Sequence, residues 1–66
     1  MNEEDALKKK LDLLKDEHRE LDTMIEDLLR ETIVNQLAVQ RLKKKKLLVR
    51  DHIARINSQL LPDIIA

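Results

Sequence analysis

No cysteine, no glycine and no aromatic residue occurs in this chain of 66 residues, and its single proline is Pro62. Without cysteine, the chain can form neither disulfides nor thiolate metal sites. Without glycine or an internal proline, tight turns that need a positive φ are disfavoured, which argues against a sheet built from β-hairpins. The lack of aromatic rings removes the usual stacking platforms for single-stranded nucleic acid.

Long apolar runs are also missing. The longest, such as Leu47-Leu48-Val49, have three residues, far short of the roughly 20 that cross a bilayer. The first residues, Met1-Asn2-Glu3-Glu4-Asp5, are acidic and lack the apolar segment of a signal peptide. We therefore expect a soluble, cytoplasmic protein without a membrane partner. Binding to a membrane surface through the amphipathic second half of the chain ranks below self-association.

A heptad pattern is the strongest positive feature of the sequence. In two stretches, residues that are mostly apolar alternate three and four positions apart, with His18 and Lys46 as polar exceptions. This spacing is typical of the a and d positions of a coiled coil. The charged fraction of 39% agrees with long, solvent-exposed helices. The predicted seam consists of Leu7, Leu11, Leu14, His18, Leu21, Ile25, Leu28, Val39, Leu42, Lys46, Val49, Ile53, Ile56 and Leu60.

We predict a single domain, residues 1–66, with two helices. The first helix runs over about residues 3–31, with Asn2 as its N-cap. The second runs over about residues 36–61 and ends before Pro62, because a proline disfavours helical geometry in the residue that precedes it. The last residues, 62–66, form a tail outside the helices.

The connection is predicted at about residues 32–35. It holds three β-branched residues and Asn35, which either adopts the left-handed conformation or caps the second helix. The heptad phase nevertheless continues through it, with Thr32 at a and Asn35 at d. The predicted fold is therefore all-α, a two-helix antiparallel coiled-coil hairpin that self-associates. A single long helix in an antiparallel coiled-coil dimer remains the alternative.

Charge is distributed unevenly although the net charge is zero. Residues 2–31 carry eleven acids and six bases, whereas residues 38–66 carry seven bases and two acids. Halves of opposite sign favour an antiparallel arrangement, because complementary charges select partner and orientation. A parallel in-register pair would instead place like charges opposite one another.

The antiparallel register predicts which residues face each other. It also brings Asp22 near Lys43, and Glu17 near His52. The stem of Lys46 can lie along Leu21 while its ammonium reaches water or Asp22. The predicted layers are Leu28 with Val39, Ile25 with Leu42, Leu21 with Lys46, His18 with Val49, Leu14 with Ile53, and Leu11 with Ile56.

Several apolar residues lie off the seam, and a lone hairpin would expose many of them. Exposed apolar area of this kind marks self-association surfaces. We therefore expect a homo-oligomer, either a dimer of hairpins or a larger assembly that resembles a four-helix bundle, with an unidentified protein partner left open. The off-seam apolar residues are Leu13, Leu29, Ile33, Val34, Leu37, Leu47, Leu48 and Leu61.

The basic segment 41–50 supports an alternative function, contact with nucleic-acid phosphates. Consecutive helical residues point in different directions, however, so this segment does not form a one-sided stripe. We therefore favour a structural or protein-interaction role over a nucleic-acid-associated one. The candidate contacts are Arg41, Lys43, Lys44, Lys45 and Arg50.

Catalytic and metal sites are not predicted. Ser58 is the only serine, and no nucleophile is paired with a base, so we expect no enzyme activity and no cofactor. His18 and His52 with neighbouring carboxylates could bind zinc. We favour instead a register-setting His18, hydrogen-bonded across the helix pair to Asp51 or Glu17, together with a register-setting Lys46.

Two sequence blocks resemble a known family. The first is Glu17-His18-Arg19-Glu20-Leu21-Asp22 followed by Ile25, and the second runs from Arg41 through four lysines to Asp51 and Ile53. Together they resemble the YdcH-like family of small bacterial proteins of unknown function. The resemblance spans about residues 14–56 and implies a cytoplasmic helical hairpin without an established catalytic residue, cofactor or partner. Arg50 stands where the family usually has lysine, and His52 where an acid is common.

Overall fold

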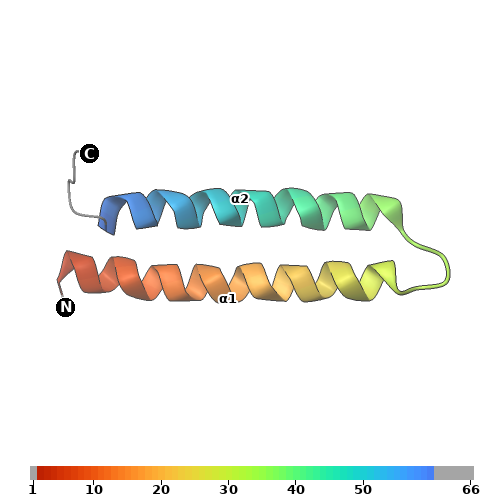
Figure 1. The fold of residues 1–66 in the computed structure, drawn as a ribbon, viewed down its shortest axis with the longest axis horizontal. Helices are drawn as coiled ribbons and strands as arrows, with labels where there is room; N and C mark the ends of the chain where they lie inside the picture. Colours follow the sequence, from red (N-terminus) through yellow and green to blue (C-terminus); the bar gives the residue numbers. More distant parts are fainter. Residues whose placement is uncertain (1, 61–66) are drawn as a thin grey trace.

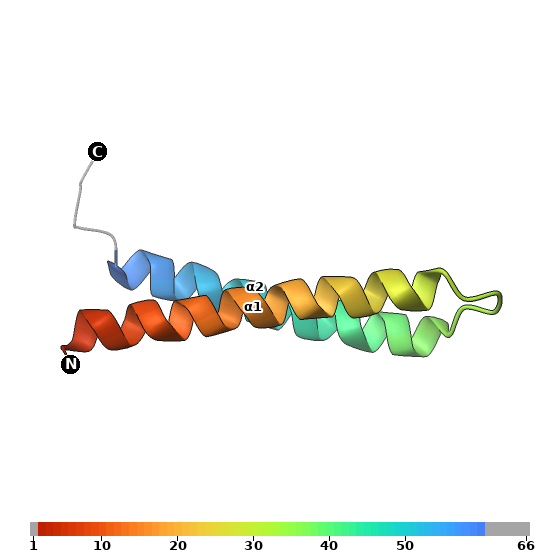
Figure 2. The same cartoon turned by 90° about the horizontal axis from the view of Figure 1, so that it is seen from below.

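A computed structural model describes residues 2–60 of the chain. It contains two helices, α1 (Glu3–Leu29) and α2 (Gln36–Leu60). They run antiparallel and lie side by side along their lengths, and they cross at a shallow angle (Figures 1 and 2). The predicted helical hairpin is confirmed. The alternative of one uninterrupted helix is wrong, because residues 30–35 leave the helical path. The predicted roles of Leu61, Pro62 and the tail lie outside the described residues.

The start of α1 follows from its capping residue. The Oδ1 atom of Asn2 accepts a hydrogen bond from the backbone N–H of Asp5 at 2.7 Å, as an N-cap does. Glu3, Glu4 and Asp5 occupy the first turn. Their negative charges favour the helix because its N-terminus carries a partial positive charge.

The end of α1 comes at Leu29, two residues before the predicted end. The backbone N–H of Arg30 donates to the carbonyl of Asp27 at 3.3 Å, and that of Glu31 donates to Leu28 at 3.3 Å. Both bonds reach back three residues and tighten the last turn. The three β-branched residues that follow have low helix propensity, which accounts for the end of the helix here.

Asn35 makes the transition into α2. Its Oδ1 atom accepts from the backbone N–H of Ala38 at 3.1 Å, and its carbonyl accepts from the N–H of Val39 at 3.1 Å. No residue in the described part of the chain has a positive φ. Of the two roles predicted for Asn35, the structure therefore shows the N-cap.

The core lies between the two helices and is thin. Leu11, Leu21, Ile25, Val39, Val49 and Ile56 are its buried side chains. The other eight seam residues, including His18 and Lys46, are half-buried. None of the described side chains is completely shielded from solvent. A chain of this size buries a limited share of its surface, so its stability depends on each seam residue.

The register is fixed by contacts at the middle and at the open end. Asp22 and Lys46 form an ion pair across the helices, and Leu7 and Leu60 line the same hollow beside the termini of the helices. The ion pair agrees with the predicted layer of Leu21 with Lys46. Leu48, two residues beyond Lys46, therefore lies level with Glu20.

Candidate functional site

A cluster of three polar side chains occupies the middle of the seam. The ammonium of Lys46 contacts the carboxylate of Asp22, and His18 Nδ1 lies 3.7 Å from Asp22 Oδ2. Within residues 2–60, Asp22 with Lys46 is the one ion pair that joins the two helices. Apart from His18 with Asp22, the other ion pairs of this part of the chain connect residues three or four apart in the sequence and lie at the surface.

Lys46 determines the electrostatics of this cluster. Its hydrogen bond lowers the pKa of the Asp22 carboxyl below the ordinary value. Desolvation opposes this effect, whereas the positive charges of Lys46 and of protonated His18 add to it. The Asp22 and Lys46 side chains remain 42% and 34% exposed, so the pair contributes little to stability. Its role is to specify register, with the lysine stem along the seam and the ammonium at its edge.

Two sequence expectations about this cluster need correction. Asp22 forms its interhelical ion pair with Lys46 and not with Lys43. His18 lies beside Asp22 of its own helix rather than beside Asp51 or Glu17. The four-residue spacing of His18 and Asp22 was a signal for this contact, because residues four apart lie on the same helix face.

The described residues do not gather the ligands of a metal site. Residues 2–60 hold no group of three or more histidine, aspartate or glutamate side chains placed to share a metal ion. The cluster of His18, Asp22 and Lys46 offers two such side chains, and its third member is a cation that repels metals. Neither α1 nor α2 contains a stretch that is long and apolar enough to cross a membrane.

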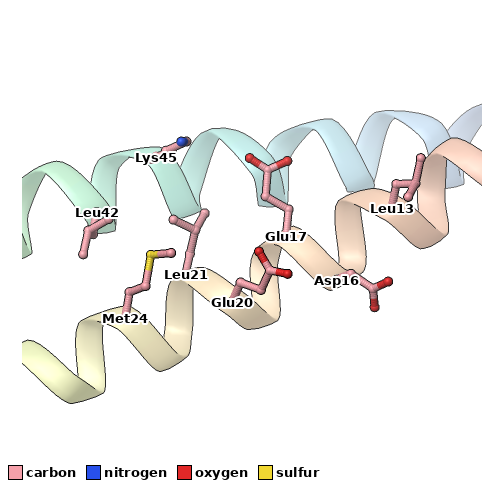
Figure 3. A pocket seen from close by; sticks show the side chains of 8 residues that line it. All are labelled: Leu13, Asp16, Glu17, Glu20, Leu21, Met24, Leu42 and Lys45. Atoms are coloured by element: carbon pink, nitrogen blue, oxygen red, sulfur yellow. The ribbon is translucent and has the colours of Figure 1, made fainter.

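A groove runs between the helices on one face of the hairpin, and we call it the central groove. Figure 3 shows Met24 of α1 and Leu42 of α2 extending toward each other, with the carboxylates of Asp16 and Glu20 on the α1 side. Apolar side chains thus form the floor, while α1 supplies an acidic rim. The central groove is lined by Leu13, Asp16, Glu17, Glu20, Leu21, Met24, Leu42 and Lys45.

Large apolar side chains are exposed away from the seam, each at least 49% accessible. The sequence analysis missed one of them, Met24, although its heptad position beside the seam was a usable signal. Val34, another off-seam apolar residue, is half-buried. The exposed large apolar residues are Leu13, Met24, Leu29, Ile33, Leu37, Leu47 and Leu48.

The candidate nucleic-acid contacts lie on different sides of α2. Lys45 borders the central groove, whereas Lys43 and Arg50 border a separate hollow with Leu47. All five side chains are exposed, and none forms an ion pair with another described residue. The five are Arg41, Lys43, Lys44, Lys45 and Arg50.

Comparison with known proteins places the chain in a family without a known activity. No curated protein and no solved structure matches it. The family described as "Protein of unknown function (DUF465)" matches residues 11–57. This segment extends from the first buried leucine of α1 to the residue after the last buried isoleucine of α2, and so it contains the whole buried core. The chain, an all-helical hairpin with an open apolar groove, therefore belongs to the DUF465 family of proteins of unknown function.

Proposed function

We propose that this chain is a non-enzymatic structural or protein-interaction module that acts through coiled-coil self-association. The observation that carries the proposal is the exposure of seven large apolar side chains on a hairpin of two helices. Leu13 and Leu48, for example, are each 64% exposed. Apolar area of this kind on a small protein marks a surface that another molecule covers.

The thinness of the core supports the same proposal. Only six side chains are buried in the described residues. Small chains commonly gain the apolar burial they lack by oligomerisation. Two hairpins that pack face to face would form a four-helix bundle, in which half-buried seam residues such as Leu14 and Leu42 become more deeply covered.

The proposal includes the absence of enzymatic activity and a cytoplasmic location. The charged groups along the central groove are carboxylates and one ammonium on an open surface. Charged side chains of this kind are typical of any solvent-exposed helix face. The resemblance to the YdcH-like family supports a bacterial cytoplasmic module and supplies no catalytic residue.

The solution mass tests the proposal. Sedimentation equilibrium of the chain, from low micromolar to millimolar concentration, should give a mass that rises to a multiple of the single-chain mass and then stays constant. Helix content followed by circular dichroism should remain that of the hairpin throughout. A single-chain mass over the whole range would contradict self-association.

A second candidate function is association with nucleic acid through segment 41–50. The observation that favours it is the set of five exposed bases in that segment that form no ion pair with the described residues. Binding carried by phosphate contacts weakens steeply as salt rises, because bound counterions are released. Anisotropy titrations with duplex DNA and RNA at several salt concentrations should show this slope, and no binding at low salt would remove the candidate.

A matched pair of triple variants sharpens that experiment. Lys43→Gln, Lys44→Gln and Lys45→Gln together remove three positive charges from α2. Lys8→Gln, Lys9→Gln and Lys10→Gln together remove three from α1, outside the segment. Nucleic-acid binding through 41–50 predicts a reduced salt slope in the first variant only. An equal loss in both variants would indicate non-specific attraction.

A further inference from the structure

We infer that a second copy of this chain covers the central groove, with its α2 lying antiparallel on α1 of the first copy. This inference rests on the proposed self-association and adds the face, the orientation and the contacts. The central groove has an apolar floor and an acidic rim. The surface that fits it is an apolar side chain with bases nearby, and α2 of a second copy offers one.

The apolar residues that could mediate this contact lie on one face. Leu13 and Met24 line the central groove from α1, and Lys45 borders it from α2. Leu48 follows Lys45 by three residues and therefore lies on the same side of α2. It borders one hollow with Asp51, His52 and Arg55, and a second one with Leu47 and Arg50. This face thus presents two apolar side chains on α1 and one on α2.

The opposite face is less suited to association. There Leu47 lies among Lys43, Lys46 and Arg50. A copy packed on that side would cover the two lysines and the arginine together with one leucine. Lys46 is already paired with Asp22, but Lys43 and Arg50 form no ion pair with another described residue, and burying like charges without partners is costly. The face with the central groove is therefore the better interface.

The levels of the residues match across such a dimer. A two-fold axis parallel to the helices places α2 of the second copy on α1 of the first. This rotation does not move any residue along the helix axis, so each residue of the second copy lies at the same level as its counterpart in the first. Since Asp22 and Lys46 are paired within one chain, Leu48 of the second copy lies level with Glu20, between Leu13 and Met24. Its side chain then covers the apolar floor of the groove.

Charge complementarity selects this arrangement. Asp16, Glu17 and Glu20 form the rim of the groove on α1. The bases that precede Leu48 on α2, Lys44 and Lys45, form no ion pairs with other described residues. Since Asp22 is level with Lys46, Lys45 of the second copy lies level with Thr23, three residues from Glu20, and its long side chain can reach that carboxylate at the end of the rim. The other two-fold arrangement, with α1 on α1, would set the acidic rims against each other and is disfavoured.

The arrangement also gives a closed dimer and not an open chain of copies. Each copy offers the groove on α1 and the Leu48 ridge on α2 on the same face, so the two-fold axis forms both contacts at once. No patch of this kind remains open for a third copy. The product is a dimer with the geometry of an antiparallel four-helix bundle.

Cysteine cross-linking tests the orientation, because the natural chain has no cysteine. One population carries Glu20→Cys and a second, isotopically labelled population carries Leu48→Cys. After mixing and mild oxidation, mass spectrometry should find mainly disulfides between residue 20 of one population and residue 48 of the other. Predominant links between two residues 20, or no link in an associated sample, would overturn the arrangement and leave self-association intact.

The solution mass of two charge variants tests the surface. Leu48→Asp places a carboxylate against the acidic rim and should weaken association by about tenfold or more. Leu37→Asp is the matched control, because Leu37 is similarly exposed (57% against 64%) and does not border the central groove. Circular dichroism checks that both variants keep their helix content.

Three outcomes of the mass measurement are informative. Loss of association in Leu48→Asp alone supports the inference. Equal behaviour of the two variants, or loss in Leu37→Asp alone, overturns it. A wild-type mass of one chain at every concentration overturns both the inference and the proposed function, whereas an associated wild type with the wrong cross-link overturns the inference only.

Discussion

Asp22 of α1 and Lys46 of α2 form an ion pair at the middle of the hairpin, where the lysine occupies a seam position that an apolar residue would normally fill. A polar residue at such a position specifies register, because any other alignment would bury its charge without a partner. The hairpin connection limits the alignments that are available, and this ion pair selects among them.

The ion pair should make stability depend on pH in the acid range. Lys46 lowers the folded-state pKa of Asp22, so the stabilisation is complete above the carboxyl's ordinary pKa and is lost as pH falls through the folded-state value. Urea unfolding at a series of pH values should show wild-type stability falling more steeply with acidification than that of Lys46→Met.

The control for this effect is Lys44→Met, since Lys44 is exposed and forms no ion pair with another described residue. His18 is present in all three proteins. Lys44→Met should follow the wild-type pH dependence. If the stability of Lys46→Met also falls with acidification as steeply as that of the wild type, the ion pair is not coupled to folding.

The seam residues should carry most of the stability. Leu21 is 3% exposed in the middle of α1, and Leu21→Ala should lower the free energy of unfolding by about 2–4 kcal/mol through lost burial and a residual cavity. Leu37→Ala removes the same atoms from an exposed position and should change it by less than about 0.5 kcal/mol. If both variants lose the same free energy of unfolding in denaturant titrations, Leu21 is not part of the buried core.

The heptad pattern explains how far sequence alone leads to this fold. All six buried side chains occupy positions of the predicted seam, for example Leu21 and Val49, because the seam is a property of helical spacing. The heptad pattern did not distinguish a hairpin from one continuous helix, because its phase continues through Thr32 and Asn35. That choice depends on local hydrogen bonds, such as the cap that Asn35 forms.

Less of the candidate site than of the fold could be predicted from the sequence. Lys46 was expected to reach Asp22, but the contact of His18 with Asp22 was not predicted, because the expected partners of His18 were Asp51 or Glu17 and not a residue one turn further along α1. The central groove was missed entirely. It depends on how Met24 and Leu42 extend from different helices toward each other, and heptad letters do not specify side-chain conformations.

The cap at the start of α2 should be needed for the bend. Asn35 Oδ1 accepts from the N–H of Ala38 at 3.1 Å, so Asn35→Ala should cost about 1 kcal/mol of stability, and Asn35→Gly only a few tenths. Asn57→Ala is the control, since Asn57 is an exposed residue within α2 and alanine suits a helix interior. Thermal unfolding followed by circular dichroism measures the series. An Asn35→Ala protein as stable as the wild type would mean that the cap does not hold the turn.

The separation of the two helix ends within one chain tests the hairpin most directly. Spin labels on Asp5→Cys and Gln59→Cys of the same chain, diluted into unlabelled protein, report the intrachain distance by pulsed electron paramagnetic resonance. Both sites are exposed; one lies in the first turn of α1 and the other in the last turn of α2. These two helix ends lie side by side at the open end of the hairpin (Figure 1). The hairpin predicts about 10–20 Å, because packed helix axes are 8–10 Å apart and label arms add to that. A distance of about 80 Å, the length of one continuous helix between the labels at 1.5 Å per residue, would contradict it.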